Sequence, residues 1–241
     1  MELRPFSRRS MLALGTATAA GGLAGVGART ALAEPTSLSP AASPSSASSE
    51  VWQRLRAGNA RFAAGRQRWP RQDPAHRRSL VEGQDPVACV LGCADSRVPA
   101  ELLFDQGLGD LFTVRAVGEV LDDAVVGSVE YAVEHLHVPV VVVLGHSRCG
   151  AVAAAIDLVQ GRSEVTGSVS TVARAIEATV RATPADPDPQ RFLAACVRTQ
   201  TARVAEELPR RSPAIRAALD DHGVEIVVGV YDLASGLVTR Y

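Results

Sequence analysis

Two short segments carry the side chains most able to do chemistry, and the first is Cys93-Ala94-Asp95-Ser96-Arg97. It places a thiol, a carboxylate and a guanidinium at every second position. In a locally extended segment residues two apart share a face, so Cys93, Asp95 and Arg97 can point into one cleft. The apolar run 87–91 precedes them and predicts a buried strand. The three side chains would then lie beyond its carboxyl end, where open α/β sheets place their chemistry.

The second segment is Gly145-His146-Ser147-Arg148-Cys149-Gly150, which follows the β-branched run 138–144. His146 and Cys149 are three residues apart, and with Cys93 they form a Cys2His set at the ends of two strands. Zinc binds thiolate and imidazole in this combination, and three protein ligands leave a fourth position open for water in a catalytic site. The sequence therefore predicts a zinc site in which Asp95 either fills the fourth position or bonds to the water.

The two remaining cysteines have a simpler interpretation. Cys89 and Cys196 lie within apolar stretches and are predicted to be small buried hydrophobic residues. Cys93, His146 and Cys149 differ because each follows an apolar strand at its carboxyl end. Two segments then converge on one rim of a sheet, which favours a metal site over packing.

The hydrophobic pattern around these segments alternates between strands and helices. Further strands are predicted at 111–114, 224–230 and 237–241, the last at an edge of the sheet. Helical stripes precede the 138–144 strand and recur between residues 151 and 219. We therefore expect an α/β fold with a mainly parallel four- to five-stranded sheet flanked by helices.

An amino-terminal helical arm is expected before the first strand. Val51, Leu55 and Phe62 recur at helical spacing and predict a helix, or a helix pair broken near Gly58-Asn59. A further short helical turn is predicted at 79–83, with Gly as its stop signal.

The composition is that of one globular domain with additional segments. The 241 residues are 46% hydrophobic and 21% charged, with a net charge of -1. All 25 basic residues are arginine, which excludes a lysine Schiff base and a P-loop lysine. The near-neutral charge offers no electrostatic footprint for nucleic acid, so we expect no nucleic-acid partner.

Residues 1–33 have the anatomy of an export signal. Arg8-Arg9 is followed by a weakly apolar run rich in Ala and Gly from Leu12 to Val26, and then by Ala31-Leu32-Ala33. This order is typical of a secretory signal, and the paired arginines indicate the twin-arginine route. The alternative is a membrane anchor, but the run is shorter than the ~20 residues that a span needs. We expect a cleaved signal that engages the export machinery and delivers the protein to the periplasm or the extracellular space.

Residues 34–49 consist almost entirely of Pro, Ser, Ala and Thr. Because this stretch has too little apolar bulk to pack, it predicts a disordered linker. The folded domain is then expected to occupy residues 50–241.

The pattern C-x-D-x-R followed by H-x2-C resembles the β-class carbonic anhydrases. The resemblance covers roughly Glu50 to Tyr241 and includes three further stretches, at 55–62, 115–118 and 229–232. Family sites also carry a glutamine nine positions before the first cysteine, where Gln84 stands. Phe112, Val117 and Tyr131 match the apolar substrate pocket of the family.

The chain departs from the family pattern at a few positions. Ala116 stands where many members have Asn, and Glu119 stands where many have Asn or His. Met11 replaces the more usual Phe of a twin-arginine signal. None of these positions is a proposed metal ligand, so the departures concern the details of the pocket.

The resemblance implies reversible hydration of CO2 to bicarbonate and a proton. Zn2+ on Cys93, His146 and Cys149 would lower the pKa of a bound water toward ~7 and so generate hydroxide. Asp95 would accept a hydrogen bond from that water and take its proton. Arg97 would pair with Asp95 and turn it away from the metal. Without the pair Asp95 could itself bind zinc, as in the closed sites of some family members.

The resemblance also implies roles for residues outside the metal set. Gln84 would donate a hydrogen bond to a bicarbonate oxygen, while Val117 and the two aromatic residues would surround CO2. The family analogue is a dimer with active sites at the subunit interface. We therefore expect a homodimer or higher oligomer in which Gln84, Phe112 and Tyr131 serve the zinc of the neighbouring chain.

Three alternatives remain open. The same site could hydrolyse COS or CS2, which are also linear and apolar. The protein could instead be a non-catalytic module that binds zinc or bicarbonate, with Asp95 permanently bound to the metal. Thiol redox chemistry is disfavoured because the sequence lacks a C-x2-C motif.

Overall fold

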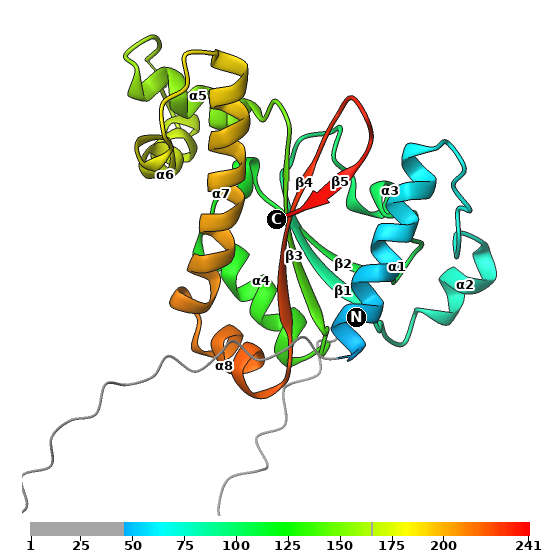
Figure 1. Cartoon of the computed structure of the whole chain (residues 1–241). Helices are drawn as coiled ribbons and strands as arrows, with labels where there is room; N and C mark the ends of the chain where they lie inside the picture. Colours follow the sequence, from blue (N-terminus) through cyan, green and yellow to red (C-terminus); the bar gives the residue numbers. More distant parts are fainter. Residues whose placement is uncertain (1–45, 165) are drawn as a thin grey trace, which may run out of the picture. The chain divides into compact units, whose positions relative to one another are not determined.

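The computed structural model describes residues 46–164 and 166–241, which are arranged around one central sheet (Figure 1). The predicted signal at 1–33 and residues 34–45 of the predicted linker lie outside the described residues. Within the described part of the chain, no helix is both long enough and apolar enough to cross a membrane.

Five strands form the sheet, in the order β2-β1-β3-β4-β5. They are β1 Ala88–Gly92, β2 Leu111–Arg115, β3 Val140–His146, β4 Glu225–Tyr231 and β5 Val238–Arg240. The first four strands run parallel, and β5 pairs antiparallel with β4. The predicted mainly parallel α/β fold with four to five strands is therefore confirmed.

The helices that cover the sheet connect its strands. They are α1 Ser46–Ala63, α2 Pro74–Ser79, α3 Ala100–Leu103, α4 Asp123–Glu134, α5 Gly150–Val159, α6 Val169–Ala182, α7 Pro189–Arg211 and α8 Pro213–Asp221, with a 3-10 turn, η1, at Val117–Glu119. Figure 1 shows α1 and α3 on one side of the sheet and α4, α7 and α8 on the other.

Two apolar cores result from the alternation of side chains along the buried strands. Leu91 and Val143 point to the face that packs against α4, α7 and α8. Val90 and Val142 point to the opposite face, where they pack with residues of α1 and α3. Every residue of β1 and β3 is buried. This burial on both faces explains why these two strands are continuous apolar runs in the sequence.

Of the two alternatives predicted for the first helix, the structure shows the single helix, because α1 runs unbroken through Gly58-Asn59 from Ser46 to Ala63. A side chain at Gly58 would overlap the backbone carbonyl of Phe104, so glycine permits close packing there. The Asn59 amide donates to the carbonyls of Leu103 (3.1 Å) and Gly236 (2.9 Å). Both residues therefore serve tertiary contacts rather than a turn.

Helix boundaries differ from the prediction at two places. Helix α1 begins at Ser46, inside the predicted 34–49 linker, and Ser48 is buried. The short helix expected at 79–83 lies instead at Pro74–Ser79. Its start is determined by Asp73, whose carboxylate accepts from the amides of Ala75 and His76, both at 2.9 Å.

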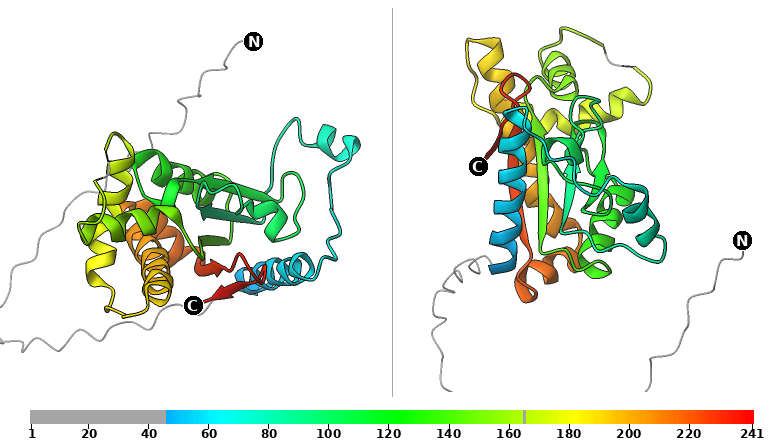
Figure 2. Two further views of the ribbon diagram at one scale, coloured as in Figure 1. Left: turned by 90° about the horizontal axis from the view of Figure 1, so that it is seen from above. Right: turned by 90° about the vertical axis from the view of Figure 1, so that its right-hand side faces the viewer.

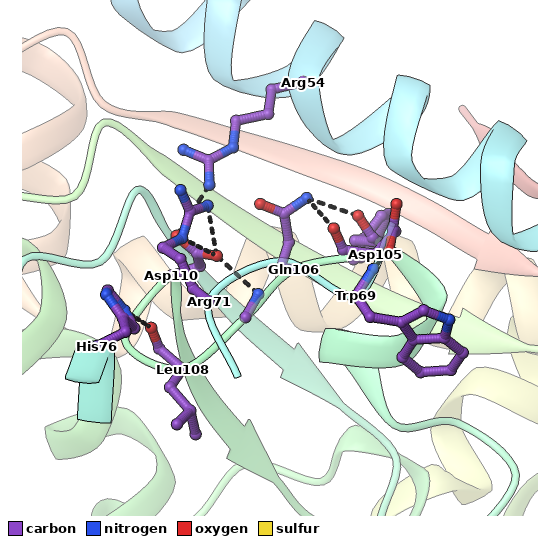
Figure 3. A network of polar contacts seen from close by, with 10 residues as sticks. Arg54, Trp69, Arg71, His76, Asp105, Gln106, Leu108 and Asp110 are labelled. Atoms are coloured by element: carbon purple, nitrogen blue, oxygen red, sulfur yellow. Dashed lines mark hydrogen bonds and ion pairs between the residues drawn. The ribbon is translucent and has the colours of Figure 1, made fainter. Parts of the chain in front are cut away.

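Helices α1 and α2 and the segment between them, residues 46–79, form the amino-terminal arm. Two buried aspartates attach this arm to the rest of the domain (Figure 3). Asp110 accepts from Arg54 of α1 at 2.9 Å and from Arg71 of the α1–α2 segment at 2.6 Å. Asp105 accepts from Arg61 at 2.6 Å and from the backbone amides of that segment. Helix α2 has no buried residue and lies at the outer end of the arm (Figures 1 and 2). The arm is thus held at its base while its tip presents an open surface.

We predict opposite effects for two helical glycines. Gly58→Ala should lower the free energy of unfolding by about 1–3 kcal/mol, because the methyl group would clash with the Phe104 carbonyl. Gly127→Ala in α4 meets no atom within 4 Å and should raise it by about 0.5–1 kcal/mol. Urea unfolding of both variants checks this. Equal effects would contradict the close approach of α1 and α3.

Candidate metal centre

Three buried side chains meet at the carboxyl edge of the sheet. Cys93 directly follows β1, His146 is the last residue of β3, and Cys149 is the residue before α5. One ligand atom from each lies within 4.8 Å of the other two. The parallel pairing of β1 with β3 places Gly92 opposite Leu144, so Cys93, just after β1, and His146, at the end of β3, lie at the same edge of the sheet. The three predicted metal ligands are thus brought into one cluster.

The imidazole of His146 is oriented for metal binding. Its Nδ1 lies 3.0 Å from the carbonyl oxygen of Ser147, and we assign Nδ1 as the protonated donor of that hydrogen bond. Nε2 then carries the lone pair, and it is buried without any hydrogen-bond partner. A buried nitrogen acceptor with no protein partner, beside two cysteine sulfurs, fits a zinc ion as its partner.

The two sulfurs are electrostatically coupled. The pKa of Cys93 is lowered to about 4, chiefly by a hydrogen bond from Cys149 and also by contacts with His146 and the Gly118 amide. The pKa of Cys149 is raised, because the Cys93 thiolate holds its proton and because it is buried. The pair therefore stabilises one thiolate and shares one proton, which a divalent cation would displace.

Asp95 and Arg97 form the predicted pair at the mouth of the cluster. Arg97 donates to both carboxylate oxygens, with Nε–Oδ1 at 2.9 Å and Nη2–Oδ2 at 2.7 Å, and its backbone amide donates at 2.9 Å. These bonds hold the pKa of Asp95 well below its usual range. Oδ2 of Asp95 still lies 3.9 Å from Nε2 of His146. The carboxylate is thus turned toward Arg97 while remaining next to the metal ligands.

An apolar cavity of about 320 Å³ opens beside Cys93 and Asp95. Val117 of η1, Ala151 of α5 and Val172 of α6 contribute to its wall. Val117, one of the predicted pocket residues, therefore lines an apolar cavity next to the metal ligands.

The other three predicted pocket residues lie elsewhere in the same chain. Gln84 is exposed before β1, while Phe112 of β2 and Tyr131 of α4 have ring centroids 5.9 Å apart. None of the three lines the cavity of its own chain. Their contribution to the active site of a neighbouring chain stays a prediction.

The sequence matches a known protein family over most of this fold. The family model described as "Carbonic anhydrase" matches residues 88–238, which include strands β1 to β4 and all three clustered ligands. The chain belongs to the β-class carbonic anhydrase family. The family resemblance drawn from the ligand motifs is therefore confirmed.

Curated carbonic anhydrases match part of this family member. Carbonic anhydrase 2 of Mycobacterium tuberculosis H37Rv is 58% identical over 106 residues, covering 44% of this chain and 51% of that protein. The carbonic anhydrase of Mycolicibacterium smegmatis is 57% identical over 111 residues, covering 46% of this chain and 54% of that protein. The chain thus spans about half the length of the curated relatives that it matches.

Solved structures share the fold over a longer stretch. A tetrameric β-carbonic anhydrase of Sordaria macrospora aligns with a TM-score of 0.62 and 23% identity, covering 79% of this chain and 96% of that chain. A Coccomyxa β-carbonic anhydrase in complex with acetazolamide aligns with a TM-score of 0.61 and 24% identity, covering 80% and 85%. At these identities the alignments establish the carbonic anhydrase fold.

Sequence reasoning assigned no site role to three residues around the cluster. Arg115 donates to the backbone carbonyls of Cys93 (3.1 Å) and Asp95 (2.6 Å) and so holds the ligand loop. The Gly118 amide donates to the Cys93 sulfur at 3.3 Å. Glu119 is buried, its Oε1 has no partner, and burial raises its pKa. The signal for the first two was their position at the carboxyl end of β2, where Arg115 is the last strand residue and Gly118 lies three positions later.

We predict that zinc binding depends on the cluster and not on buried cysteines in general. His146→Ala and Cys149→Ala should each lose the equivalent of zinc that the wild-type protein retains after dialysis, since each removes a ligand. Cys89→Ala, at a buried cysteine within β1, should retain it. Atomic emission spectroscopy measures the metal content. Loss of zinc in the Cys89 variant alone would refute this assignment.

Proposed function

We propose that the protein catalyses the reversible hydration of CO2 to bicarbonate and a proton, with zinc held by Cys93, His146 and Cys149. The observation that carries this proposal is the buried Cys2His cluster with the Arg97-paired carboxylate of Asp95 3.9 Å from His146. Membership of the β-class carbonic anhydrase family supports it.

Zinc, when bound, supplies the Lewis acidity that brings the pKa of a water molecule near neutrality. The two cysteine thiolates would neutralise the formal charge of the ion, and His146 would be the third protein ligand. Arg97 occupies both oxygens of Asp95, which favours leaving the fourth coordination position to water rather than to the carboxylate. This arrangement supports a catalytic site over a permanently closed one.

Asp95 is the acceptor best placed for the proton of the attacking water. Because Arg97 keeps its pKa low, the group is a carboxylate at every working pH and accepts a hydrogen bond. A base of low pKa does not retain a proton for long, so the proton passes on to solvent or buffer. Asp95 thus orients the water and relays its proton.

The apolar cavity suits the substrate. Val117, Ala151 and Val172 offer no hydrogen bond that would compete for the water, and CO2 needs none to enter. COS and CS2 share its linear apolar form, so stopped-flow assays with each substrate separate these alternatives. Bicarbonate is charged and has no ionic partner on this wall, which favours its release.

We predict that Asp95→Asn retains zinc but lowers the rate of CO2 hydration by about 100-fold or more, because the amide cannot accept the proton. Asp157→Asn is the control, since it alters another paired aspartate, bound to Arg162 on the surface. Stopped-flow hydration and metal content are measured on both variants. Wild-type turnover in Asp95→Asn would remove the role assigned to this carboxylate.

We also propose export by the twin-arginine route, with residues 1–33 as the signal. Arg8-Arg9 and the A-x-A sequence at 31–33 support this. All four cysteines are unpaired and buried in the described domain. A protein that crosses the membrane already folded would keep these thiols away from an oxidising compartment.

Finally, we propose that the protein is a homodimer or a higher homo-oligomer. Apolar side chains are exposed on and near the arm and α4, including Val81 (76%), Leu108 (45%) and Tyr131 (45%). Burying them against a second chain would remove their apolar surface from water. Helix α2 has no buried residue, which is consistent with a partner at the tip of the arm.

Mixed dimers test whether the active site is shared. A chain with Gln84→Leu keeps its metal ligands, and a chain with Cys149→Ala keeps Gln84. If Gln84 serves the neighbouring zinc, a purified dimer of the two chains has one intact site and should recover about half of the wild-type activity.

Two differently tagged chains allow this mixed dimer to be isolated and assayed by stopped-flow. In the control, Gln53→Leu, at an exposed glutamine of α1, replaces Gln84→Leu. The homodimer of the Gln53→Leu chain should already be active before it is mixed with the Cys149→Ala chain. Activity no higher than the mean of the two parent variants would contradict a shared site. A monomer by light scattering would contradict the oligomer itself.

A further inference from the structure

A chain of buried hydrogen bonds leads from α6 to the metal ligands. The Thr179 hydroxyl donates to Oε1 of Gln200 at 2.6 Å, and Nε2 of Gln200 donates to the Gly118 carbonyl at 3.2 Å. The Gly118 amide in turn donates to the sulfur of Cys93 at 3.3 Å. Thr179 is 1% exposed and Gln200 is 4% exposed, so water does not compete for these bonds. Four elements, α6, α7, η1 and the loop after β1, are connected in this way.

The polar pair lies where apolar packing is the norm. The buried neighbours of Gln200 on α7 include Cys196, Val197 and Val204, and Thr201 is the other buried polar residue of that helix. A buried amide costs free energy unless its hydrogen bonds are made, so packing alone would favour an apolar side chain. The Thr179 hydroxyl accounts for the orientation, because it makes Oε1 the acceptor and leaves Nε2 to face Gly118.

Gly118 has little freedom to move. Its φ of +66° lies in the left-handed region, and a Cβ there would lie 2.8 Å from both Ala151 Cβ and Ile176 Cδ1. Helices α5 and α6 therefore press on one side of the residue, and Gln200 holds its carbonyl. The same residue presents its amide to Cys93, so the direction of that N–H depends on how the turn is held.

A backbone amide that donates a hydrogen bond to a cysteine ligand changes how much electron density the sulfur donates to the metal. It stabilises the thiolate and withdraws charge from it, which leaves the bound metal a stronger Lewis acid. We infer that Gln200, oriented by Thr179, is a positioning residue that holds the Gly118 amide on the Cys93 sulfur and so tunes metal binding and reactivity. The effect on turnover rests on the proposed function, whereas the effect on metal binding does not.

The principal test is Gln200→Met in the full chain, which keeps the side-chain length and removes both hydrogen bonds. The zinc dissociation constant, measured by competition with a chelator, should rise by about 10- to 100-fold. In the cobalt-substituted protein the sulfur-to-cobalt charge-transfer band should move to longer wavelength, because the sulfur holds its electrons less tightly. The pH midpoint of CO2 hydration should move to higher pH, because a more basic thiolate donates more charge to the metal.

Val204→Ala is the matched control. Val204 is buried one turn further along α7, and its truncation loosens the core without breaking the hydrogen-bonded chain. It should lower stability and leave the zinc dissociation constant and the cobalt band unchanged. An equal change in Val204→Ala would show that Gln200 acts only through packing and would overturn the inference.

Thr179 provides a second test if Gln200→Met does not fold. Thr179→Val removes the hydroxyl at nearly constant volume and should shift both metal readouts in the same direction by a smaller amount. Thr179→Ser keeps the hydroxyl and should behave like the wild type. Unchanged readouts in a folded Gln200→Met or, failing that, in Thr179→Val would overturn the inference. A wild-type chain that binds zinc without hydrating CO2 would refute the proposed function and leave these metal readouts valid.

Discussion

The structure depends on the parallel pairing of β1 with β3. Both strands are buried on both faces, so a shift of one residue would send each side chain into the opposite core, where the packing is built for others. The register that pairs Gly92 with Leu144 is therefore strongly determined by packing. Because the strands run in the same direction, the residues that follow them meet at one edge. The metal cluster exists because packing requirements elsewhere in the sheet place Cys93 and His146 side by side.

Burying ionisable groups at this edge has a cost that the surrounding loops offset. The Cys93 thiolate accepts a hydrogen bond from the Gly118 amide, and His146 donates one to the backbone carbonyl of Ser147. Arg97 forms an ion pair with Asp95. The contacts of Cys93 and Asp95 favour their ionised forms, and the contact of His146 fixes the orientation of its ring. The exception is Glu119, a buried carboxyl whose Oε1 has no partner and which lies near the negative Cys93. Burial and the nearby Cys93 raise its pKa, which favours the neutral acid over a further negative charge beside the Cys93 thiolate.

The amino-terminal arm shows a different use of buried charge. Asp105 and Asp110 lie in the connection between α3 and β2, and each accepts several donors from the arm. These donors come from α1 and from the segment before α2, so two aspartates hold a long stretch of chain against the sheet. Buried ion pairs stabilise little beyond apolar packing of the same volume, but they specify one arrangement when each oxygen is satisfied. The arm can then present its exposed tip at a defined position.

Periodicity and residue spacing were sufficient for the strand positions, the parallel sheet and the Cys2His set. These features depend on local patterns, because a strand buried on both faces must be apolar and its carboxyl end must carry the polar residues. Local patterns left two alternatives at Gly58-Asn59, which resembles a turn signal but lies inside the unbroken α1. The reason is a close contact with Phe104 and distant hydrogen bonds to Leu103 and Gly236, which no local pattern contains.

By itself, the sequence determined which residues can bind the metal and that they follow adjacent strands. Only the tertiary structure decided how those residues are oriented. The bond from Gly118 to Cys93 joins residues 25 positions apart, and that from Gln200 to Gly118 joins residues 82 apart. Such contacts depend on how η1, α6 and α7 pack around the sheet. The physical reason is that coordination needs only a set of nearby ligands, whereas the tuning of their charge depends on hydrogen bonds made by the whole fold.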